Sequence, residues 1–238
     1  MQPTLSNQVA LVTGGSRGIG RAIAQALLEE GARVAICGRS QAALEQAVKE
    51  LRSRHGDAVH GLVADVGRPE EVSALFRGVD DRFGMVDVLV NNAGVGLFGA
   101  TADLTLEQWR QVIDTNVNGA FYCSHEALAR FRKTGGGYII NISSLAGKNP
   151  FAGGAAYNAS KFALNGFSEA MMLDHRYDGV RVTYIMPGSV DTEFRRGTPR
   201  ADWKIQPEDV AAIVLMLLHM PARTLVSRVE VRPSKPKK

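Results

Sequence analysis

The sequence predicts a doubly wound α/β fold, in which a mostly parallel seven-stranded sheet carries helices on both faces. Short apolar runs alternate with helix-compatible segments along all 238 residues. A glycine-rich turn joins the first apolar run to its helix, and no change in composition marks a linker or a second domain. We therefore expect one domain over residues 1–238, with flexible tails at 1–6 and 233–238.

The strands are predicted from short apolar runs that are rich in β-branched residues and bounded by glycine, proline or polar residues. Continuous apolar runs of this kind are typical of parallel strands buried on both faces of a sheet. The predicted strands are residues 9–13, 32–37, 58–63, 87–91, 138–142, 180–185 and 227–231.

The helices are predicted from apolar periodicity and from signals at their ends. Gly31 is expected to end the first helix as a C-cap, and Pro69 is expected to begin another at a first-turn position. A strand, turn, helix and strand in succession indicate parallel strands joined by a right-handed crossover. The predicted helices follow the glycine turn, cover residues near 41–54, begin at 69, and span 105–131, 157–178 and 207–219.

The composition excludes several classes of protein. The net charge is +4, and no basic stripe with interleaved aromatic residues indicates a nucleic-acid surface. Two cysteines, Cys37 and Cys123, lie in apolar runs and are expected to be buried thiols in a reducing compartment. The five histidines show no metal-ligand spacing, and no secretory signal or membrane-spanning run is recognisable. We expect a cytoplasmic protein that binds neither nucleic acid nor membrane.

The glycine turn is a candidate phosphate-binding site. Gly14, Gly18 and Gly20 lie between a strand and a helix, where glycine lets the backbone approach an anion and the helix offers unpaired N–H groups. The spacing differs from the usual G-x-G-x-x-G fingerprint, and no Gly-Lys-Ser/Thr of a P-loop follows. The alternative is a turn whose glycines serve backbone geometry alone.

The end of the second strand predicts which dinucleotide is bound. An acidic residue there would accept a bond from the ribose 2′-OH of NAD and repel the 2′-phosphate of NADP. This segment has no acid and contains Arg39, while the glycine turn contains Arg17. Because a guanidinium pairs with phosphate in a forked geometry, we expect NADP(H) as the cofactor.

Tyr157 and Lys161 are the candidate centre of the chemistry. Four residues apart on a predicted helix, they share one face one turn apart. A nearby ammonium favours phenolate and is expected to lower the pKa of the Tyr157 phenol, which makes the phenol usable for proton transfer. The alternative for so short a pattern is a surface tyrosine and a solvated lysine.

These motifs resemble, in order, those of the short-chain dehydrogenase/reductase family, whose compact members are single Rossmann-type domains. The resemblance covers roughly residues 7–215, and the end at 226–233 lacks the glycine-rich ending common in many members. It rests on the glycine turn at 13–20, Asp65 with Val66, Asn-Asn-Ala-Gly at 91–94, Asn-Val-Asn-Gly at 116–119, Ile-Ser-Ser at 142–144, Tyr157 with Lys161, and Pro187-Gly188 followed by Val190 and Thr192.

The resemblance implies the catalytic residues Asn116, Ser144, Tyr157 and Lys161. No metal is expected, because the histidines lack metal-ligand spacing. Tyr157 would exchange a proton with the substrate oxygen, which Ser144 would hold. Lys161 would lower the pKa of Tyr157 and bond the nicotinamide ribose, and Asn116 would hold a water in a proton relay. The residues expected to bind NADP(H) are Gly14, Ser16, Arg17, Gly18, Ile19, Gly20, Arg39, Ser40, Asp65, Val66, Asn92, Ala93, Gly94, Tyr157, Lys161, Pro187, Gly188, Val190 and Thr192.

The predicted function is hydride transfer between NADPH and a carbonyl or secondary alcohol, with a 3-oxoacyl thioester or another ketone as a candidate substrate. The alternative is a non-catalytic NADP-binding sensor or scaffold; a sugar-nucleotide epimerase is disfavoured by the short C-terminal part.

In relatives, the two long helices form a four-helix contact, so a homodimer or homotetramer is expected. The loops expected to face substrate mix apolar residues with the basic residues Arg195, Arg196, Arg200 and Lys204, which either bind an acidic group or face water.

Overall fold

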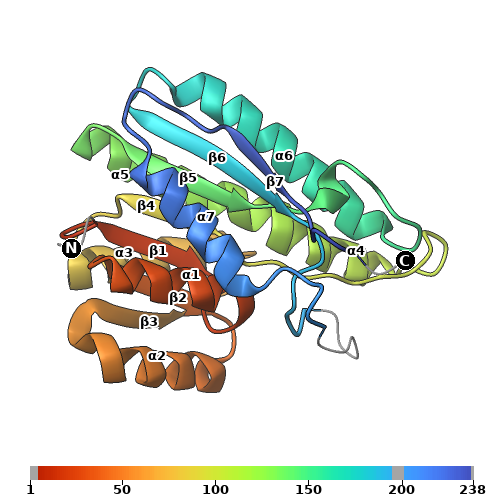
Figure 1. Ribbon diagram of the computed structural model, residues 1–238, viewed down its shortest axis with the longest axis horizontal. Helices are drawn as coiled ribbons and strands as arrows, with labels where there is room; N and C mark the ends of the chain where they lie inside the picture. Colours follow the sequence, from red (N-terminus) through yellow and green to blue (C-terminus); the bar gives the residue numbers. More distant parts are fainter. Residues whose placement is uncertain (1–4, 195–200, 237–238) are drawn as a thin grey trace.

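The computed structural model describes residues 5–194 and 201–236, and within them seven strands form one sheet. The strand order is β3-β2-β1-β4-β5-β6-β7, and every neighbouring pair runs parallel (Figure 1). The doubly wound fold predicted from the sequence is confirmed. The strands are β1 Val9–Thr13, β2 Arg33–Gly38, β3 Val59–Val63, β4 Val88–Asn91, β5 Gly137–Ile142, β6 Val180–Pro187 and β7 Arg228–Val231.

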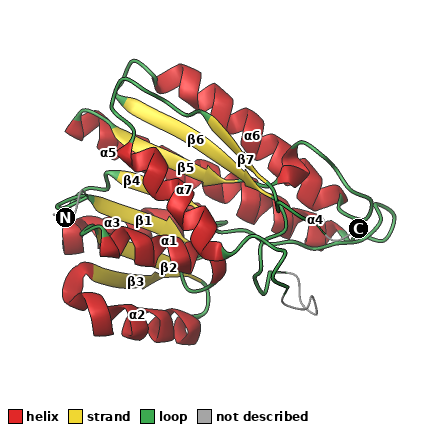
Figure 2. Ribbon diagram, viewed as in Figure 1, coloured by secondary structure: helices red, strands yellow, loops and turns green. Residues whose placement is uncertain are grey.

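The helices cover both faces of the sheet (Figure 2). Buried residues of α1, α2 and α7 pack into one hydrophobic cluster, and those of α3, α5 and α6 pack into a second cluster. Each face of the sheet therefore has its own helical layer. The helices are α1 Gly18–Glu29, α2 Gln41–His55, α3 Pro69–Phe83, α4 Leu106–Ile113, α5 Gly119–Thr134, α6 Ala155–His175 and α7 Pro207–His219.

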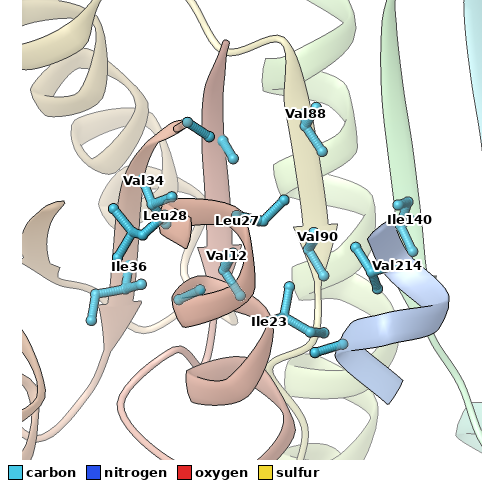
Figure 3. Packing of buried hydrophobic residues seen from close by; sticks show 14 of the residues in the cluster. Val12, Ile23, Leu27, Leu28, Val34, Ile36, Val88, Val90, Ile140 and Val214 are labelled. Carbon is cyan, nitrogen blue, oxygen red and sulfur yellow. The ribbon is translucent and has the colours of Figure 1, made fainter. Parts of the chain in front are cut away.

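Alternation along the strands divides the core between the two layers. On β1, Val12 faces the cluster that contains α1 and α7, whereas Leu11 belongs to the cluster on the opposite face. Figure 3 shows Ile23 and Leu27 of α1 and Val214 of α7 packed against the strands. Because the central strands are buried on both faces, they appear in the sequence as unbroken apolar runs.

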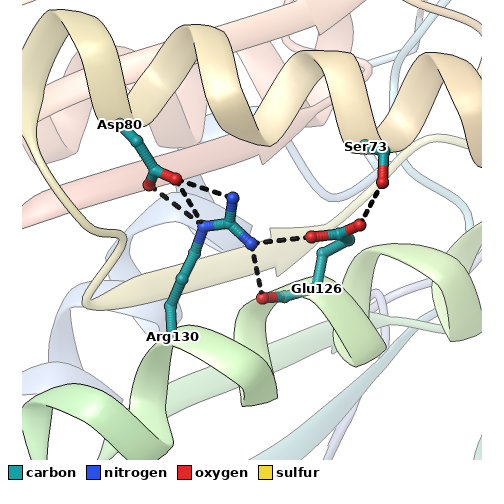
Figure 4. A network of polar contacts seen from close by, with 4 residues as sticks. All are labelled: Ser73, Asp80, Glu126 and Arg130. Atoms are coloured by element: carbon teal, nitrogen blue, oxygen red, sulfur yellow. Dashed lines mark hydrogen bonds and ion pairs between the residues drawn. The ribbon is translucent and has the colours of Figure 1, made fainter.

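A buried arginine joins α3 to α5 on the second face (Figure 4). The guanidinium of Arg130 donates to both carboxylate oxygens of Asp80 at 2.6–3.0 Å and to Glu126 Oε2 at 2.7 Å. Glu126 also accepts a short hydrogen bond from Ser73, and the guanidinium lies over the ring of Phe76. The pairing compensates the burial of the charge and fixes the two helices relative to each other.

The predicted helix at 105–131 is interrupted where it passes the site. α4 is followed by a π-helical turn, Asp114–Asn118, and then by α5, which continues to Thr134. A π turn inserts an extra residue and is common at functional sites. The sequence pattern could not indicate it, because apolar periodicity does not distinguish a π turn from an α turn.

The two predicted flexible tails contain packed residues. Leu5 is buried, and its backbone N–H donates to the carbonyl of Glu30 at 3.1 Å, so residue 5 departs from the prediction of a tail over 1–6. Residues 232–236 form no helix or strand, but Pro233 approaches Gly188 at the end of β6. Among the described residues, none of the helices is long and apolar enough to cross a bilayer.

Candidate functional site

The predicted site residues gather at the carboxyl edge of the sheet. In a parallel sheet the carboxyl ends of all strands meet at one edge, and ligands bind where the strand order reverses. Here the reversal falls between β1 and β4. Gly14 follows β1, Asn92 follows β4, Ser144 follows β5 and Gly188 follows β6. Segments far apart in the sequence therefore form one site.

The glycine turn has the geometry that a pyrophosphate requires. Gly14 and Gly18 adopt φ values of 66° and 54°, which disfavour residues with a side chain. A Cβ on Gly20 would lie 2.4 Å from Asn92 Nδ2, so this position has no room for a side chain. The first turn of α1 contains no acidic residue, and its N-cap, Arg17, makes no side-chain capping bond. Backbone N–H groups at this helix end are thus suited to an anion.

Thr13 and Asn92 tie the glycine turn to the end of β4. Thr13 Oγ1 accepts the backbone N–H groups of Asn92 and Ala93, both at 3.0 Å. The Asn92 amide donates to the carbonyls of Thr13 and Gly14 at 2.9 and 3.2 Å. Asn92, predicted to bind the cofactor, therefore uses its amide to position the turn. Thr13 was not among the predicted site residues; its signal is a hydroxyl at the end of an otherwise apolar strand.

Most of the other residues predicted to bind the adenosine half of the cofactor lie around the end of β2. Ser16 Oγ lies 3.4 Å from a Cβ built on Gly38, while Ile19 packs against the core. Ser40 Oγ caps α2 by accepting the N–H of Ala43 at 3.4 Å. Val66 is buried against Gly119. These contacts bring the predicted residues of the glycine turn and of the end of β2 to the same corner of the sheet.

Both predicted phosphate-binding arginines reach carboxylates in this structure. Arg39 Nη1 lies 3.9 Å from Asp65 Oδ2, and Arg17 Nη1 lies 3.8 Å from Glu193 Oε2. The side chain of Arg39 is half exposed and that of Arg17 is more exposed, so each pair contributes little free energy. The sequence shows no acid at the end of β2, but Asp65, after β3, supplies one. Its Oδ1 also accepts the N–H of Gly67 at 3.0 Å.

Three of the four predicted catalytic side chains, Ser144, Tyr157 and Lys161, approach one another at the end of β5 and the start of α6. Tyr157 and Lys161 are one turn apart on α6, with Lys161 Nζ 5.7 Å from the centroid of the Tyr157 ring. Lys161 is buried, and Nζ donates to the carbonyl of Ile142 at 2.9 Å. Ser144 hydrogen-bonds the Tyr157 phenol, and its hydroxyl also accepts the N–H of Ala146.

Asn116 lies in the π turn and holds the segment after β4. Its Oδ1 accepts the N–H of Val95 at 2.8 Å, and its Nδ2 donates to the carbonyl of Val95 and to Ser160 Oγ. The sequence predicted that Asn116 would hold a water in a proton relay. That role stays a prediction. The side-chain amide bonds protein groups and thereby fixes Val95 and the adjoining Gly94. A Cβ on Gly94 would lie 3.4 Å from Asn116 Oδ1 and 3.9 Å from Lys161 Nζ.

Burial governs the protonation of the tyrosine and lysine. Burial lowers the pKa of Lys161 from 10.5 to about 8. Burial raises the pKa of Tyr157, and the hydrogen bond from Ser144 opposes that rise. The expectation that Lys161 would lower the pKa of this phenol is not met in the chain alone. The reason is burial: with its own pKa lowered to about 8, Lys161 is already neutral in the range where the phenol titrates, so it cannot offset the effect of burial on Tyr157.

The loop after β6 closes the site beside the glycine turn. The N–H of Gly188 donates to the carbonyl of Val231 at 2.8 Å, so the atypical C-terminal strand β7 supports the Pro187–Gly188 end of β6. Val190 pairs with Ile205 in an isolated bridge. Thr192 Cγ2 lies 3.3 Å from a Cβ built on Gly18. The two halves of the predicted cofactor site are therefore neighbours.

A buried ion pair fixes the base of this loop. Lys204 Nζ lies 3.6 Å from Asp191 Oδ1, and the two side chains are only 7% and 11% exposed. Lys204 was one of four basic residues considered for an acidic substrate group or a solvated loop. Its charge is buried and paired with Asp191, so it takes neither role. Arg195, Arg196 and Arg200 lie outside the described residues.

Taken together, the fold and the site define a dinucleotide-binding α/β oxidoreductase. The family model described as short chain dehydrogenase matches residues 8–203. The chain belongs to the short-chain dehydrogenase family.

Relatives of the chain match nearly all of its length. An uncharacterized oxidoreductase of Staphylococcus saprophyticus is 35% identical over 233 residues, covering 96% of this chain and 98% of the relative. An alcohol dehydrogenase from the archaeon Thermococcus sibiricus, solved with 5-hydroxy-NADP, has a TM-score of 0.88 and 32% identity, covering 97% and 99% of the two chains. A metagenomic short-chain oxidoreductase, solved with NADP, has a TM-score of 0.86 and 37% identity, covering 98% and 99%.

The buried lysine predicts a pH-dependent stability. The folded-state pKa of Lys161, about 8, is below the ordinary value of 10.5. Below pH 8 the folded chain therefore bears the cost of a buried charge, and this cost disappears as the pH rises to 10.5. Relative to Lys161→Met, the unfolding free energy of the wild type is expected to increase by about 3 kcal/mol across this range. Urea denaturation at both pH values, with exposed Lys133→Met as a control, measures it. A parallel pH dependence in wild type and Lys161→Met would contradict the assignment.

Proposed function

We propose that the protein is an NADP(H)-dependent oxidoreductase that interconverts a carbonyl compound and a secondary alcohol. The observation that carries the proposal is the placement of Tyr157, Lys161 and Ser144 together at the sheet edge that holds the glycine turn. The turn fits a dinucleotide because its glycines leave no room for side chains and an uncapped helix end follows it. A 3-oxoacyl thioester or another ketone is the candidate substrate.

The side chains of the chain supply proton transfer and orientation. When bound, NADPH supplies the hydride for the carbonyl carbon, or its oxidised form accepts one from the alcohol. Tyr157 donates its phenolic proton to the carbonyl oxygen, and in the reverse direction the phenolate removes it. Ser144 donates a hydrogen bond to the same oxygen. Lys161 would bond the nicotinamide ribose, and in its charged form beside the bound cofactor it would favour the phenolate.

Asn116 contributes by positioning. Its amide fixes the backbone of Val95, and with it the Gly94 position that faces Lys161 Nζ. Glycine there keeps the approach to the ammonium open. The non-catalytic sensor or scaffold considered from the sequence has no observation in its favour, because a binding protein needs no half-buried phenol beside Ser144 and Lys161.

Tyr157→Phe is expected to reduce kcat by about 10²- to 10⁴-fold, because the variant lacks the proton donor. Absorbance of NADPH with a panel of ketones, aldehydes and 3-oxoacyl thioesters measures the loss. Tyr177→Phe is the matched control, since Tyr177 is 92% exposed beyond the far end of α6. Near-wild-type turnover by a folded Tyr157→Phe protein would contradict the proposal.

We propose NADP(H) over NAD(H) because Arg39 directly follows β2, Arg17 lies in the glycine turn, and their exposed ion pairs are weak enough to exchange for a phosphate. The solved oxidoreductases from the archaeon and the metagenome, both bound to NADP-type nucleotides, support this choice.

Arg39→Ala is expected to weaken NADPH binding by about 10- to 100-fold, the effect of removing a charge-assisted hydrogen bond. NADH binding, which involves no 2′-phosphate, is expected to be unchanged. Fluorescence titration with each nucleotide measures both affinities, and Arg82→Ala, an exposed arginine at the far end of α3, is the control. A wild type that binds NADH more tightly than NADPH would overturn the cofactor assignment.

We also propose that the chain forms a homodimer or homotetramer through the outer surface of α5 and α6. Phe121, Phe162 and Leu173 expose about half of their surface there, and Phe121, Phe167 and Met171 line a groove between the helices. Light scattering is expected to give the mass of two or four chains, and Phe121→Asp is expected to reduce it. A single-chain mass for the wild type would contradict the proposal.

A further inference from the structure

Phenylalanines from three separate loops form a cluster beside Tyr157, and two of them contact its ring. We call Phe98, Phe151 and Phe194 the aromatic rim. The Phe98 and Phe194 rings lie 5.6 and 5.7 Å from the Tyr157 ring between centroids, and Phe151 lies 5.9 Å from Phe98. Phe98 follows β4, Phe151 precedes α6 and Phe194 follows β6. Loops after different strands thus place aromatic rings beside the predicted proton donor.

Glycines in the loops let the rim form. A Cβ on Gly96 would lie 2.7 Å from ring atoms of both Phe98 and Phe194. A Cβ on Gly154 would lie 2.6 Å from the Phe151 ring. The N–H of Gly99 donates to the carbonyl of Gly153 at 2.8 Å and joins the two loops. The ring positions therefore depend on close backbone contacts, which a flexible surface loop would not need.

The rim leaves apolar surface exposed beside the site. Phe151 and Phe194 are 44% and 42% exposed, although aromatic side chains gain most from burial. Exposed aromatic surface next to a buried polar group is typical of a binding site for an amphipathic ligand. A ligand suited to this surface would place a polar group on Tyr157 and Ser144 and an apolar part against the rim.

Charge around the rim favours a neutral substrate. Among the described residues of this edge, the cations Arg17, Lys148 and Lys204 each lie within ion-pair distance of a carboxylate. Glu193, next to Phe194, is the partner of Arg17, so this pair adds no net charge at the mouth. Because a carboxylate already pairs with each of these three cations, they offer little attraction to an anionic acyl carrier.

From these observations, and resting on the proposed function, we infer that the preferred substrates are uncharged aryl ketones and aldehydes, whose ring packs against the aromatic rim while the carbonyl oxygen reaches Tyr157 and Ser144. Edge-to-face and offset contacts between aromatic rings favour an aromatic group over a saturated group of the same size. Phe98 and Phe194 are the specificity-determining residues, because their rings adjoin the Tyr157 ring directly.

The test compares two ketones of the same carbon skeleton, acetophenone and cyclohexyl methyl ketone. The ratio of their kcat/KM values is measured in the wild type, Phe98→Leu and Phe194→Leu. Leucine retains an apolar side chain but removes the ring. The two ketones differ in intrinsic reactivity, but this difference cancels when the ratio of their kcat/KM values is compared between variants. Each rim variant is expected to lower the acetophenone preference by about 2- to 13-fold, the fold-change equivalent of one aromatic pair. The control variant Tyr177→Leu changes an exposed residue beyond the end of α6 and is expected to retain the wild-type preference for acetophenone.

An unchanged ratio in both folded rim variants would overturn the inference and leave the proposed function intact. If the wild type reduces aliphatic ketones or 3-oxoacyl thioesters but is inactive on acetophenone, the inference is also overturned and the proposed function stays intact. Absence of NADPH oxidation with every carbonyl tested would overturn the proposed function and, with it, this inference. Thermal unfolding of each variant verifies that it is folded.

Discussion

The buried ammonium of Lys161 is the constraint on which the site depends. A charge with so little solvent must be compensated by protein groups, and the carbonyl of Ile142 at the end of β5 provides a hydrogen bond at 2.9 Å. This bond fixes α6 against the carboxyl edge of the sheet. Because Tyr157 is one helical turn away, fixing the lysine also fixes the phenol. Ser144, two residues after Ile142, then meets the phenol from the same strand end.

Hydrogen bonds between loops hold the rest of the site around this pair. Thr13 and Asn92 join the glycine turn to the end of β4, and the amide of Asn116 holds the next residues of that segment. The pair of Asp191 and Lys204 fixes the loop after β6. Most of these contacts cross between segments that are distant in sequence. The sheet supplies the convergence of strand ends, and the polar side chains determine how closely the loops approach.

The sequence was sufficient for the fold because buried parallel strands are local apolar runs, as residues 9–13 and 138–142 illustrate. The glycine turn and Tyr157 with Lys161 were also recognisable, since short spacings define them. Three other features could not be recognised in the sequence. The π turn at Asn116 has no signature in the apolar periodicity of the sequence. The pairing of Asp191 with Lys204 depends on the path of the loop between them, which the sequence does not predict. The rise in the pKa of Tyr157 depends on how deeply the folded chain buries the phenol.

The most direct test of hydride transfer at this site uses NADPH that carries deuterium at both C4 positions, with acetophenone as the carbonyl compound. Mass spectrometry of the alcohol formed by the wild-type protein follows the label. The account predicts one deuterium on the carbinol carbon, because the hydride passes from the cofactor to carbon while the Tyr157 proton goes to oxygen. An alcohol without deuterium, or tight NADPH binding with no alcohol from any carbonyl compound, would contradict it.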